Sequence, residues 1–213
     1  MEEEDFDFFL NDELELLEND DLHSFSDCEY WNKRYTINKR VFDWYENLEY
    51  FWRILNGKIT TQGIALNIGC GTSNMSKSLL NIGFTKVIST DISEVAINIM
   101  KNKFKSIKEL EWVVDDCRKM SFESDSFDCV FEKGITDSLI CCDKPSLPLT
   151  MFYREVMRVL KPGGFFVLIT YGPPEDRLKY FKKSGIFDCY KESIEVQPKI
   201  ARHTPHYVYL LVK

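Results

Sequence analysis

The chain alternates short apolar segments with amphipathic ones along most of its length. Apolar runs predict strands at residues 64–68, 86–90, 110–114, 127–131 and 165–170, and helical spacing predicts helices at 41–55, 73–80, 93–105, 149–160 and 175–183. Strands that alternate with helices form a parallel, doubly wound sheet covered on both faces. Two further strands, around residue 194 and at 207–212, have no helix between them, so we expect an antiparallel hairpin at one edge. The pattern therefore predicts an α/β, Rossmann-like, seven-stranded and mostly parallel sheet.

The first part of the chain differs in charge from the rest. Residues 1–29 hold 13 acidic side chains and no Lys or Arg, which leaves 21 acidic against 27 basic residues in the remainder. Because like charges oppose compaction, we expect an acidic, flexible leader at 1–28 and one domain at 29–213. Apolar residues recur at helical spacing within the leader, at Phe6, Phe9, Leu10, Leu14 and Leu17, so an amphipathic helix there is the alternative. We predict that deletion of residues 1–26 leaves the domain folded and active.

Composition excludes several classes of protein. No apolar run reaches the roughly 18 residues of a membrane span, and the acidic N-terminus is not the basic start of a signal peptide. The seven cysteines include no CxxC pair, which argues against a disulfide framework and a zinc site. His203 and His206 are spaced HxxH beside Pro205, and we interpret them as edge or surface residues rather than metal ligands. We therefore expect no metal and a cytoplasmic location.

A glycine turn follows the first predicted strand. It reads Leu66-Asn67-Ile68-Gly69-Cys70-Gly71-Thr72-Ser73 and opens a predicted helix. The two glycines, Gly69 and Gly71, allow a tight turn and the close approach of a ligand. A turn that needs glycine only for its own geometry would look the same, so this motif alone does not identify a ligand.

Carboxylates at the ends of the next two strands add to this signal. Asp91 ends the second predicted strand, where it can accept hydrogen bonds from both hydroxyls of a ribose. Asp116 follows the third strand, where its side chain can meet an adenine amino group while Cys117 offers a backbone N–H. Either carboxylate alone is equally well explained as a solvated strand end. Their joint placement in one alternating chain predicts a nucleoside site.

Two nucleoside cofactors compete for such a site. A dinucleotide-binding turn has a third glycine three residues after the second, but that position is Asn74. The pyrophosphate of NAD also favours a helix N-terminus, whereas S-adenosylmethionine carries a sulfonium and an amino acid instead. The sequence therefore favours S-adenosylmethionine, with S-adenosylhomocysteine as product. An ATP-binding P-loop is excluded because no GxxxxGK[ST] occurs.

These residues resemble the class I, seven-strand S-adenosylmethionine-dependent methyltransferases, which share the glycine turn and the Leu160-Lys161-Pro162-Gly163-Gly164 turn before the fifth strand. More specific elements resemble the methyltransferase-like group that modifies lysines of translation elongation factor one-alpha. They are Tyr30-Trp31-Asn32-Lys33-Arg34-Tyr35, Phe42-Asp43-Trp44-Tyr45, and Phe131-Glu132-Lys133-Gly134 with Asp137. The likeness extends from about residue 29 to the C-terminus.

The resemblance implies a role for each matching position. Trp31, Tyr35 and Trp44 would close over the cofactor, although packing in the core is the alternative for these aromatic side chains. The other implied cofactor contacts are Gly69 and Lys133 at the methionine part, Asp91 and Ile92 at the ribose and adenine, and Asp116 and Cys117 at the adenine.

The implied substrate rests on weaker matches than the cofactor. The chain reads Ile135-Thr136-Asp137 where the group has Thr-Leu-Asp, and many superfamily members have an acidic residue at the position of Asn67. Methyl transfer to an amine requires alignment and a neutral nitrogen. Candidates for a general base near the strand ends are Glu132, Asp137 and Tyr171, and each is equally well explained as a surface or packing residue.

We interpret the chain as a protein-lysine methyltransferase whose partner is a protein, with elongation factor one-alpha as the implied substrate. Methyltransferases of exocyclic base amines carry an Asn/Asp-Pro-Pro-aromatic motif where this chain has Glu132-Lys133-Gly134. We therefore expect neither a nucleic acid nor a membrane as partner, and a monomer. A small-molecule or RNA acceptor, or a cofactor-binding adaptor without catalysis, are the alternatives.

Overall fold

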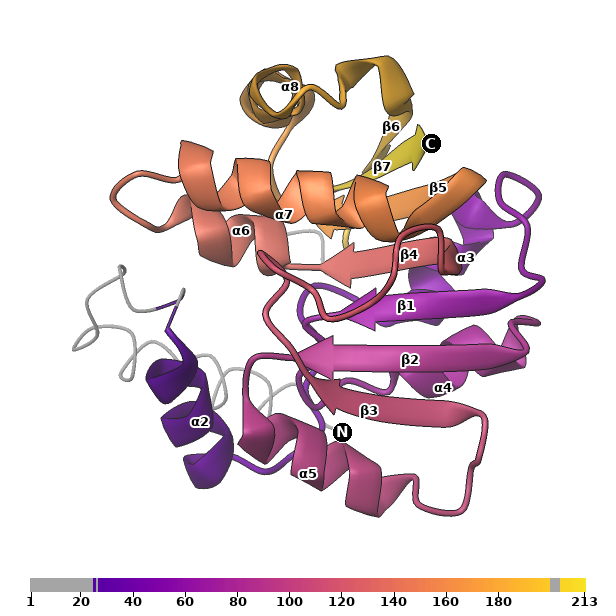
Figure 1. Cartoon of the computed structure of the whole chain (residues 1–213), viewed down its shortest axis with the longest axis vertical. Helices are drawn as coiled ribbons and strands as arrows, with labels where there is room; N and C mark the ends of the chain where they lie inside the picture. The colour runs from indigo at the N-terminus through magenta and orange to yellow at the C-terminus, as the bar shows by residue number, and fades with distance from the viewer. Residues whose placement is uncertain (1–24, 26, 200–203) are drawn as a thin grey trace.

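The computed structural model describes residues 25, 27–199 and 204–213. Seven strands form one sheet in the order β3-β2-β1-β4-β5-β7-β6 (Figure 1). Five strands run parallel, and β7 is antiparallel to both of its neighbours. Their bounds are β1 Ile64–Ile68, β2 Lys86–Asp91, β3 Leu110–Val114, β4 Phe127–Lys133, β5 Leu160–Thr170, β6 Tyr190–Val196 and β7 His206–Val212. The predicted doubly wound, mostly parallel sheet is confirmed, and β7 lies inside the sheet with β6 at its edge.

Helices cover both faces of the sheet, as parallel strands require. One apolar cluster joins α3, α4 and α5 to one face, and a second cluster joins α6, α7 and α8 to the other. In Figure 1, α6 and α7 lie in front of the strands while α3 and α4 lie behind them. The helices are α2 Cys28–Ile37, α3 Leu48–Leu55, α4 Met75–Asn81, α5 Glu94–Lys103, α6 Ile135–Ile140, α7 Ser146–Val159 and α8 Pro174–Ser184, with a short 3-10 turn at Phe187–Cys189.

Most predicted elements occur within a few residues of their expected bounds. The helix after β2 is capped at its start, because the Ser93 side chain accepts a hydrogen bond from the Ala96 N–H. Among the described residues, no helix is long and apolar enough to cross a membrane. The predicted leader helix and His203 lie outside the described residues.

One predicted helix is wrong over its first half. Helical spacing predicts a helix over residues 41–55, but α3 begins only at Leu48, where the Asn47 side chain caps it by accepting from the Tyr50 N–H. Upstream of this cap, Tyr45 has a left-handed backbone with φ +67°. The preceding residues therefore form a loop, and the spacing of its aromatic side chains is misleading.

Two other regions differ from the sequence-based expectation. Helix α6 follows β4 directly, and its short run of six residues was not predicted. His206 was expected at an edge or on the surface, and this prediction is wrong: it begins the inner strand β7 and is buried. Its ring packs against Tyr45, with 4.8 Å between the ring centroids.

Candidate functional site

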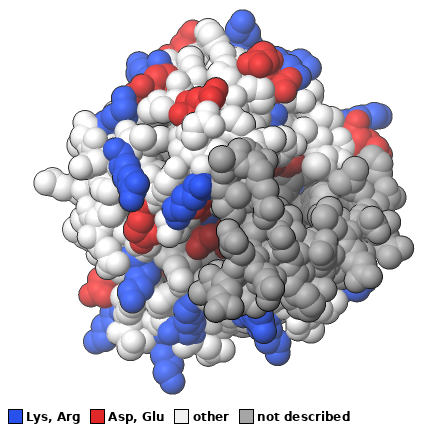
Figure 2. All heavy atoms as spheres, turned by 180° about the vertical axis from the view of Figure 1, so that it is seen from behind, with Lys and Arg blue, Asp and Glu red and all other residues white. Residues whose placement is uncertain are grey.

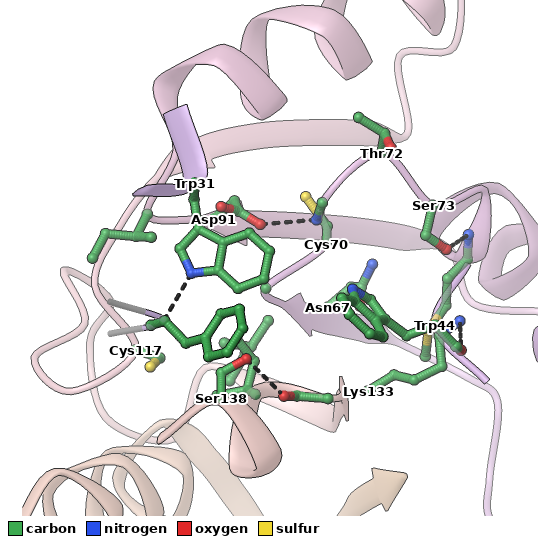
Figure 3. A pocket seen from close by; sticks show the side chains of 18 of the residues that line it. Trp31, Trp44, Asn67, Cys70, Thr72, Ser73, Asp91, Cys117, Lys133 and Ser138 are labelled. Atoms are coloured by element: carbon green, nitrogen blue, oxygen red, sulfur yellow. Dashed lines mark hydrogen bonds between the residues drawn. The ribbon is translucent and has the colours of Figure 1, made fainter. Parts of the chain in front are cut away.

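A cavity opens at the carboxyl ends of the central parallel strands, which is where open α/β sheets bind ligands. The space within it, open solvent at its mouth included, is about 940 Å³. All ten residues predicted to contact a cofactor line this cavity: Trp31, Tyr35, Trp44, Gly69, Gly71, Asp91, Ile92, Asp116, Cys117 and Lys133. Figure 3 shows Trp31 and Trp44 on opposite sides of it, with Asp91 beside Trp31 and Lys133 beside Trp44. The structure thus brings these positions together, and their contacts with a cofactor remain predictions.

The glycine turn after β1 is shaped by neighbours that leave no room for side chains. Gly69 and Gly71 have φ of +62° and +48°. A Cβ on Gly69 would lie 2.1 Å from the Ile135 side chain, and one on Gly71 would lie 2.6 Å from the Tyr35 hydroxyl oxygen. Both the left-handed backbone and the close contacts therefore require glycine here.

Asp91 lies at the end of β2 with its carboxylate turned toward this turn. One oxygen accepts the Gly71 N–H and the other accepts the Ser93 N–H, each at 2.8 Å. Burial raises the pKa of Asp91 to about 6, although these backbone donors act in the opposite direction. Each oxygen keeps a further lone pair, so the carboxylate can accept two more hydrogen bonds from a ligand.

Asp116 and Cys117 follow β3 at the next part of the wall. The Asp116 carboxylate pairs with the Arg118 guanidinium, whose Nε donates to it at 2.9 Å and whose Nη2 donates at 2.7 Å. Partial burial raises the pKa of Asp116, but the bonds and charge of Arg118 outweigh it and lower the pKa overall. Arg118 also lines the cavity, and no motif in the sequence indicates this.

The N-terminal helix α2 places aromatic side chains over the cavity. Trp31 stacks on Tyr35 with 5.9 Å between ring centroids, and the Trp31 indole N–H donates to the Phe25 carbonyl at 2.8 Å. The Arg34 guanidinium lies over the Trp44 ring at 5.3 Å from its centroid, which joins α2 to the loop before α3. Phe25 also lines the cavity, so a contact to the domain begins inside the predicted leader.

Lys133 ties that loop to the end of β4. Its ammonium donates to the Asp43 carboxylate at 2.7 Å and to the carbonyls of Trp44 and Glu46 at 2.9 and 3.0 Å. Asp43 accepts a second hydrogen bond from the Ser73 hydroxyl in the glycine turn. Because all three ammonium hydrogens are used, Lys133 fixes the loop that carries Trp44 into the cavity. Sequence reasoning missed this function of Asp43.

The three candidates for a general base do not line the cavity. Glu132 is fully buried, accepts from the Ile135 N–H and the Thr136 hydroxyl, and has a pKa that burial raises to about 8. Asp137 is buried beside it in α6. Tyr171 is 48% exposed after β5. None of these contacts identifies a base for the reaction.

Asn67, which stands where many relatives have an acidic residue, is used inside the fold. It is buried in β1, lines the cavity, and donates from Nδ2 to the Ser76 hydroxyl at 2.9 Å. The Ser76 and Ser89 hydroxyls form a further hydrogen bond at 2.7 Å. A neutral amide suits this buried position because a carboxylate would require a charged partner.

The order of the seven strands, the glycine turn after β1 and the acidic ends of β2 and β3 define a class I, seven-strand S-adenosylmethionine-dependent methyltransferase. Residues 66–168 match the family described as a methyltransferase domain. The class and the cofactor predicted from the sequence are thereby confirmed.

Several known proteins are similar to this chain. Mouse "EEF1A lysine methyltransferase 4" is 29% identical over 166 residues, which cover 73% of this chain and 65% of the relative. Human "eEF1A lysine and N-terminal methyltransferase" is 30% identical over 150 residues, which cover 68% of this chain and 22% of the relative. The chain thus matches under two thirds of the mouse relative's length and about a fifth of the human relative's.

Solved structures agree on the fold. A SAM-dependent methyltransferase from Methanosarcina mazei superposes with a TM-score of 0.58 at 20% identity, covering 75% of this chain and 96% of that one. The PH0226 protein from Pyrococcus horikoshii OT3 superposes with a TM-score of 0.59 at 21% identity, covering 93% of this chain and 98% of that one.

Proposed function

We propose that this protein transfers the methyl group of S-adenosylmethionine to the side-chain amine of a lysine in a protein, with elongation factor one-alpha as the first candidate. The observation that carries the proposal is the cavity, in which one buried carboxylate and an aromatic cover come together at the ends of the parallel strands. The names of the mouse and human relatives support the choice of acceptor.

The residues of the cavity fit this cofactor part by part. In our proposal, the open lone pairs of Asp91 accept the two ribose hydroxyls, and the adenine lies toward Asp116 and Cys117. The methionine part lies along the glycine turn at Gly69, beneath the loop that Lys133 holds in place. This placement brings the reactive end of the cofactor to Gly134, at the carboxyl end of β4.

The chain's own residues contribute alignment and exclusion of water. The cofactor supplies a methyl group that a sulfonium activates, so the protein has to hold a neutral amine in line with it. Burial beside the aromatic ring of Trp44 favours the neutral form of an incoming lysine, because desolvation lowers the pKa of an amine. The incoming lysine ammonium would first give one proton to water. The new carbon–nitrogen bond would then form as the carbon–sulfur bond breaks with its electron pair on sulfur, and the product would be a methylated ammonium.

The surface and the thiols support the rest of the proposal. Figure 2 shows the face opposite to that of Figure 1, with Lys and Arg side chains scattered among Asp and Glu over its described part. This distribution fits a protein partner better than a nucleic acid. All seven cysteines are free thiols, which fits the reducing cytoplasm. We propose a cytoplasmic monomer.

The proposal is tested by incubating the protein with methyl-labelled S-adenosylmethionine and a cell lysate, followed by mass spectrometry of the labelled species. A labelled protein whose modified residue is lysine supports it. Label in RNA or in a small molecule, with no labelled protein, contradicts the proposed acceptor and leaves the cofactor site intact. Cofactor binding without any transfer favours an adaptor that does not catalyse.

A further inference from the structure

Two side chains on one face of α2 bind this helix to the turn between β2 and α5. Oδ1 of Asn32 accepts the Ser93 hydroxyl at 2.7 Å and, at a longer 3.4 Å, the Val95 N–H. One helical turn earlier, the Cys28 thiol donates to the Ile92 carbonyl at 3.1 Å. The Asn32 Nδ2 also donates to the Cys28 sulfur at 3.4 Å, which links the two contacts. These bonds join segments that are more than sixty positions apart in the chain.

The turn that α2 contacts also forms part of the cavity wall. Asp91 and Ile92 line the cavity. The Ser93 N–H donates to the Asp91 carboxylate at 2.8 Å, and the Ser93 hydroxyl accepts from the Ala96 N–H. A hydroxyl has one hydrogen to donate, and Ser93 gives it to Asn32. Removal of the Asn32 amide therefore frees α2 from this turn and leaves the bonds of Ser93 to Asp91 and to α5 in place.

A neighbouring face of α2 covers the cavity. Trp31 and Tyr35 both line it, and their rings stack with 5.9 Å between the centroids. The Tyr35 hydroxyl lies so close to Gly71 that a Cβ there would be 2.6 Å from it. Asn32 does not belong to the cavity wall. It can therefore act on a ligand only through the position of α2.

We propose that Asn32 is a positioning residue for the cofactor: its bond with Ser93 holds α2 on the turn after β2, so that Trp31 and Tyr35 stay closed over bound S-adenosylmethionine. The cofactor is then released when this bond opens and α2 moves away, so Asn32 sets the rate of dissociation. The inference rests on the proposed function, because it requires the cofactor contacts that we propose for Trp31 and Tyr35. It does not depend on the methyl acceptor.

The test compares Asn32→Ala with Asn32→Asp in the full chain. Asp keeps an oxygen that accepts from Ser93 and Val95, whereas Ala keeps neither bond. Release of S-adenosylhomocysteine is followed by stopped-flow tryptophan fluorescence. We expect the dissociation rate to rise about tenfold in Asn32→Ala, the worth of one well-formed hydrogen bond, and to stay within about threefold in Asn32→Asp. Asn102→Ala, the same change at an exposed position of α5, should match the wild type.

Two further measurements separate this role from a contribution to stability alone. Bound S-adenosylhomocysteine should protect the Lys33 and Arg34 peptide bonds in α2 from trypsin in the wild type and in Asn32→Asp, and should fail to do so in Asn32→Ala. Ser93→Ala removes the same hydrogen bond from its donor side and should raise the dissociation rate as well. The double variant Asn32→Ala with Ser93→Ala should show no further rise, because both changes remove one interaction.

The inference and the proposed function fail in different ways. If Asn32→Ala unfolds cooperatively and releases S-adenosylhomocysteine at the wild-type rate within about twofold, the inference is wrong and the proposed function stands. If Asn32→Asp loses as much as Asn32→Ala, the bond to Ser93 is not the cause and the inference is also wrong. Should Asn32→Ala fail to fold, an unchanged rate in Ser93→Ala overturns the inference. If the wild type binds no S-adenosylhomocysteine, the proposed function fails and the inference fails with it.

Discussion

Asp91 lines the cavity and Asp137 is buried in α6 outside it, and the two carboxylates are held in opposite ways. Asp91 accepts hydrogen bonds from backbone N–H groups of the glycine turn and of the residue that caps α5. Asp137 accepts from side chains of three separate segments, namely Tyr45, Thr170 and Arg177. Asp91 therefore has only neutral partners, whereas Asp137 has a cation.

The difference assigns the two carboxylates different tasks. Neutral donors leave Asp91 with a raised pKa and with lone pairs open to the cavity, which suits a residue that completes its bonds only when a ligand arrives. The hydrogen-bond partners of Asp137 are side chains of the protein and are already in place, so this carboxylate stabilises the fold. We therefore expect changes at Asp91 to lower the affinity for the ligand, and changes at Asp137 or its partners to lower the stability of the fold.

Arg177→Met tests the structural side of this comparison and should have the largest effect. The variant leaves Asp137 buried without its cation, so we expect the free energy of unfolding to fall by about 3–5 kcal/mol in urea denaturation. Lys179→Met, which removes an exposed pair with Asp176, should change it by less than about 0.5 kcal/mol. Equal effects of the two variants would show that Asp137 does not depend on its cation.

Asp91→Ala tests the ligand-binding side. Loss of two hydrogen bonds to a charged acceptor should weaken S-adenosylmethionine binding about a hundredfold in isothermal titration calorimetry. The fold should persist, because the removed charge is itself costly to bury. Asp188→Ala, at an exposed position, is the matched control. Unchanged affinity in Asp91→Ala would refute the assignment of the site.

The raised pKa of Asp91 predicts a pH dependence of binding. Below about pH 6 the carboxylate takes up a proton, and cofactor affinity should fall by up to tenfold per pH unit. The contribution of Asp91 to folding stability changes with pH in the opposite direction to cofactor affinity. Because its pKa is raised in the folded state, this group stabilises the fold at low pH, and that stabilisation is lost as pH rises through about 6. Calorimetry and denaturation of the wild type and Asp91→Asn between about pH 5 and 7 check both, and the variant should show neither trend.

Truncation of the acidic leader should have the smallest effect. Deletion of residues 1–24 keeps the Phe25 carbonyl that accepts the Trp31 indole N–H, so we expect unfolding free energy to change by less than about 0.5 kcal/mol. Deletion of 1–26 removes that acceptor, and cofactor affinity should drop about threefold to tenfold with the domain still folded. Loss of cooperative unfolding in the shorter deletion would show that the leader is part of the core.

The two aspartates also show why the sequence predicted one side of the site better than the other. The donors to Asp91 come from the next turn and from the glycine motif, so local spacing was sufficient to place it. The partners of Asp137 lie 33, 40 and 92 positions away in the chain, and only the packing of β5, α8 and the loop before α3 brings them together. That loop was also predicted as helix, because its aromatic spacing does not reveal that Lys133 and Asp137 hold it in a non-helical path.

We propose that the cavity around Asp91 serves methyl transfer to lysine, and intact-mass and peptide mass spectrometry of purified elongation factor one-alpha tests this claim most directly. The factor is incubated with S-adenosylmethionine and either the wild type or Asp91→Ala. We predict added methyl groups on a lysine with the wild type and none with Asp91→Ala. Methylation by both proteins alike, or by neither while the wild type binds cofactor, would contradict the claim.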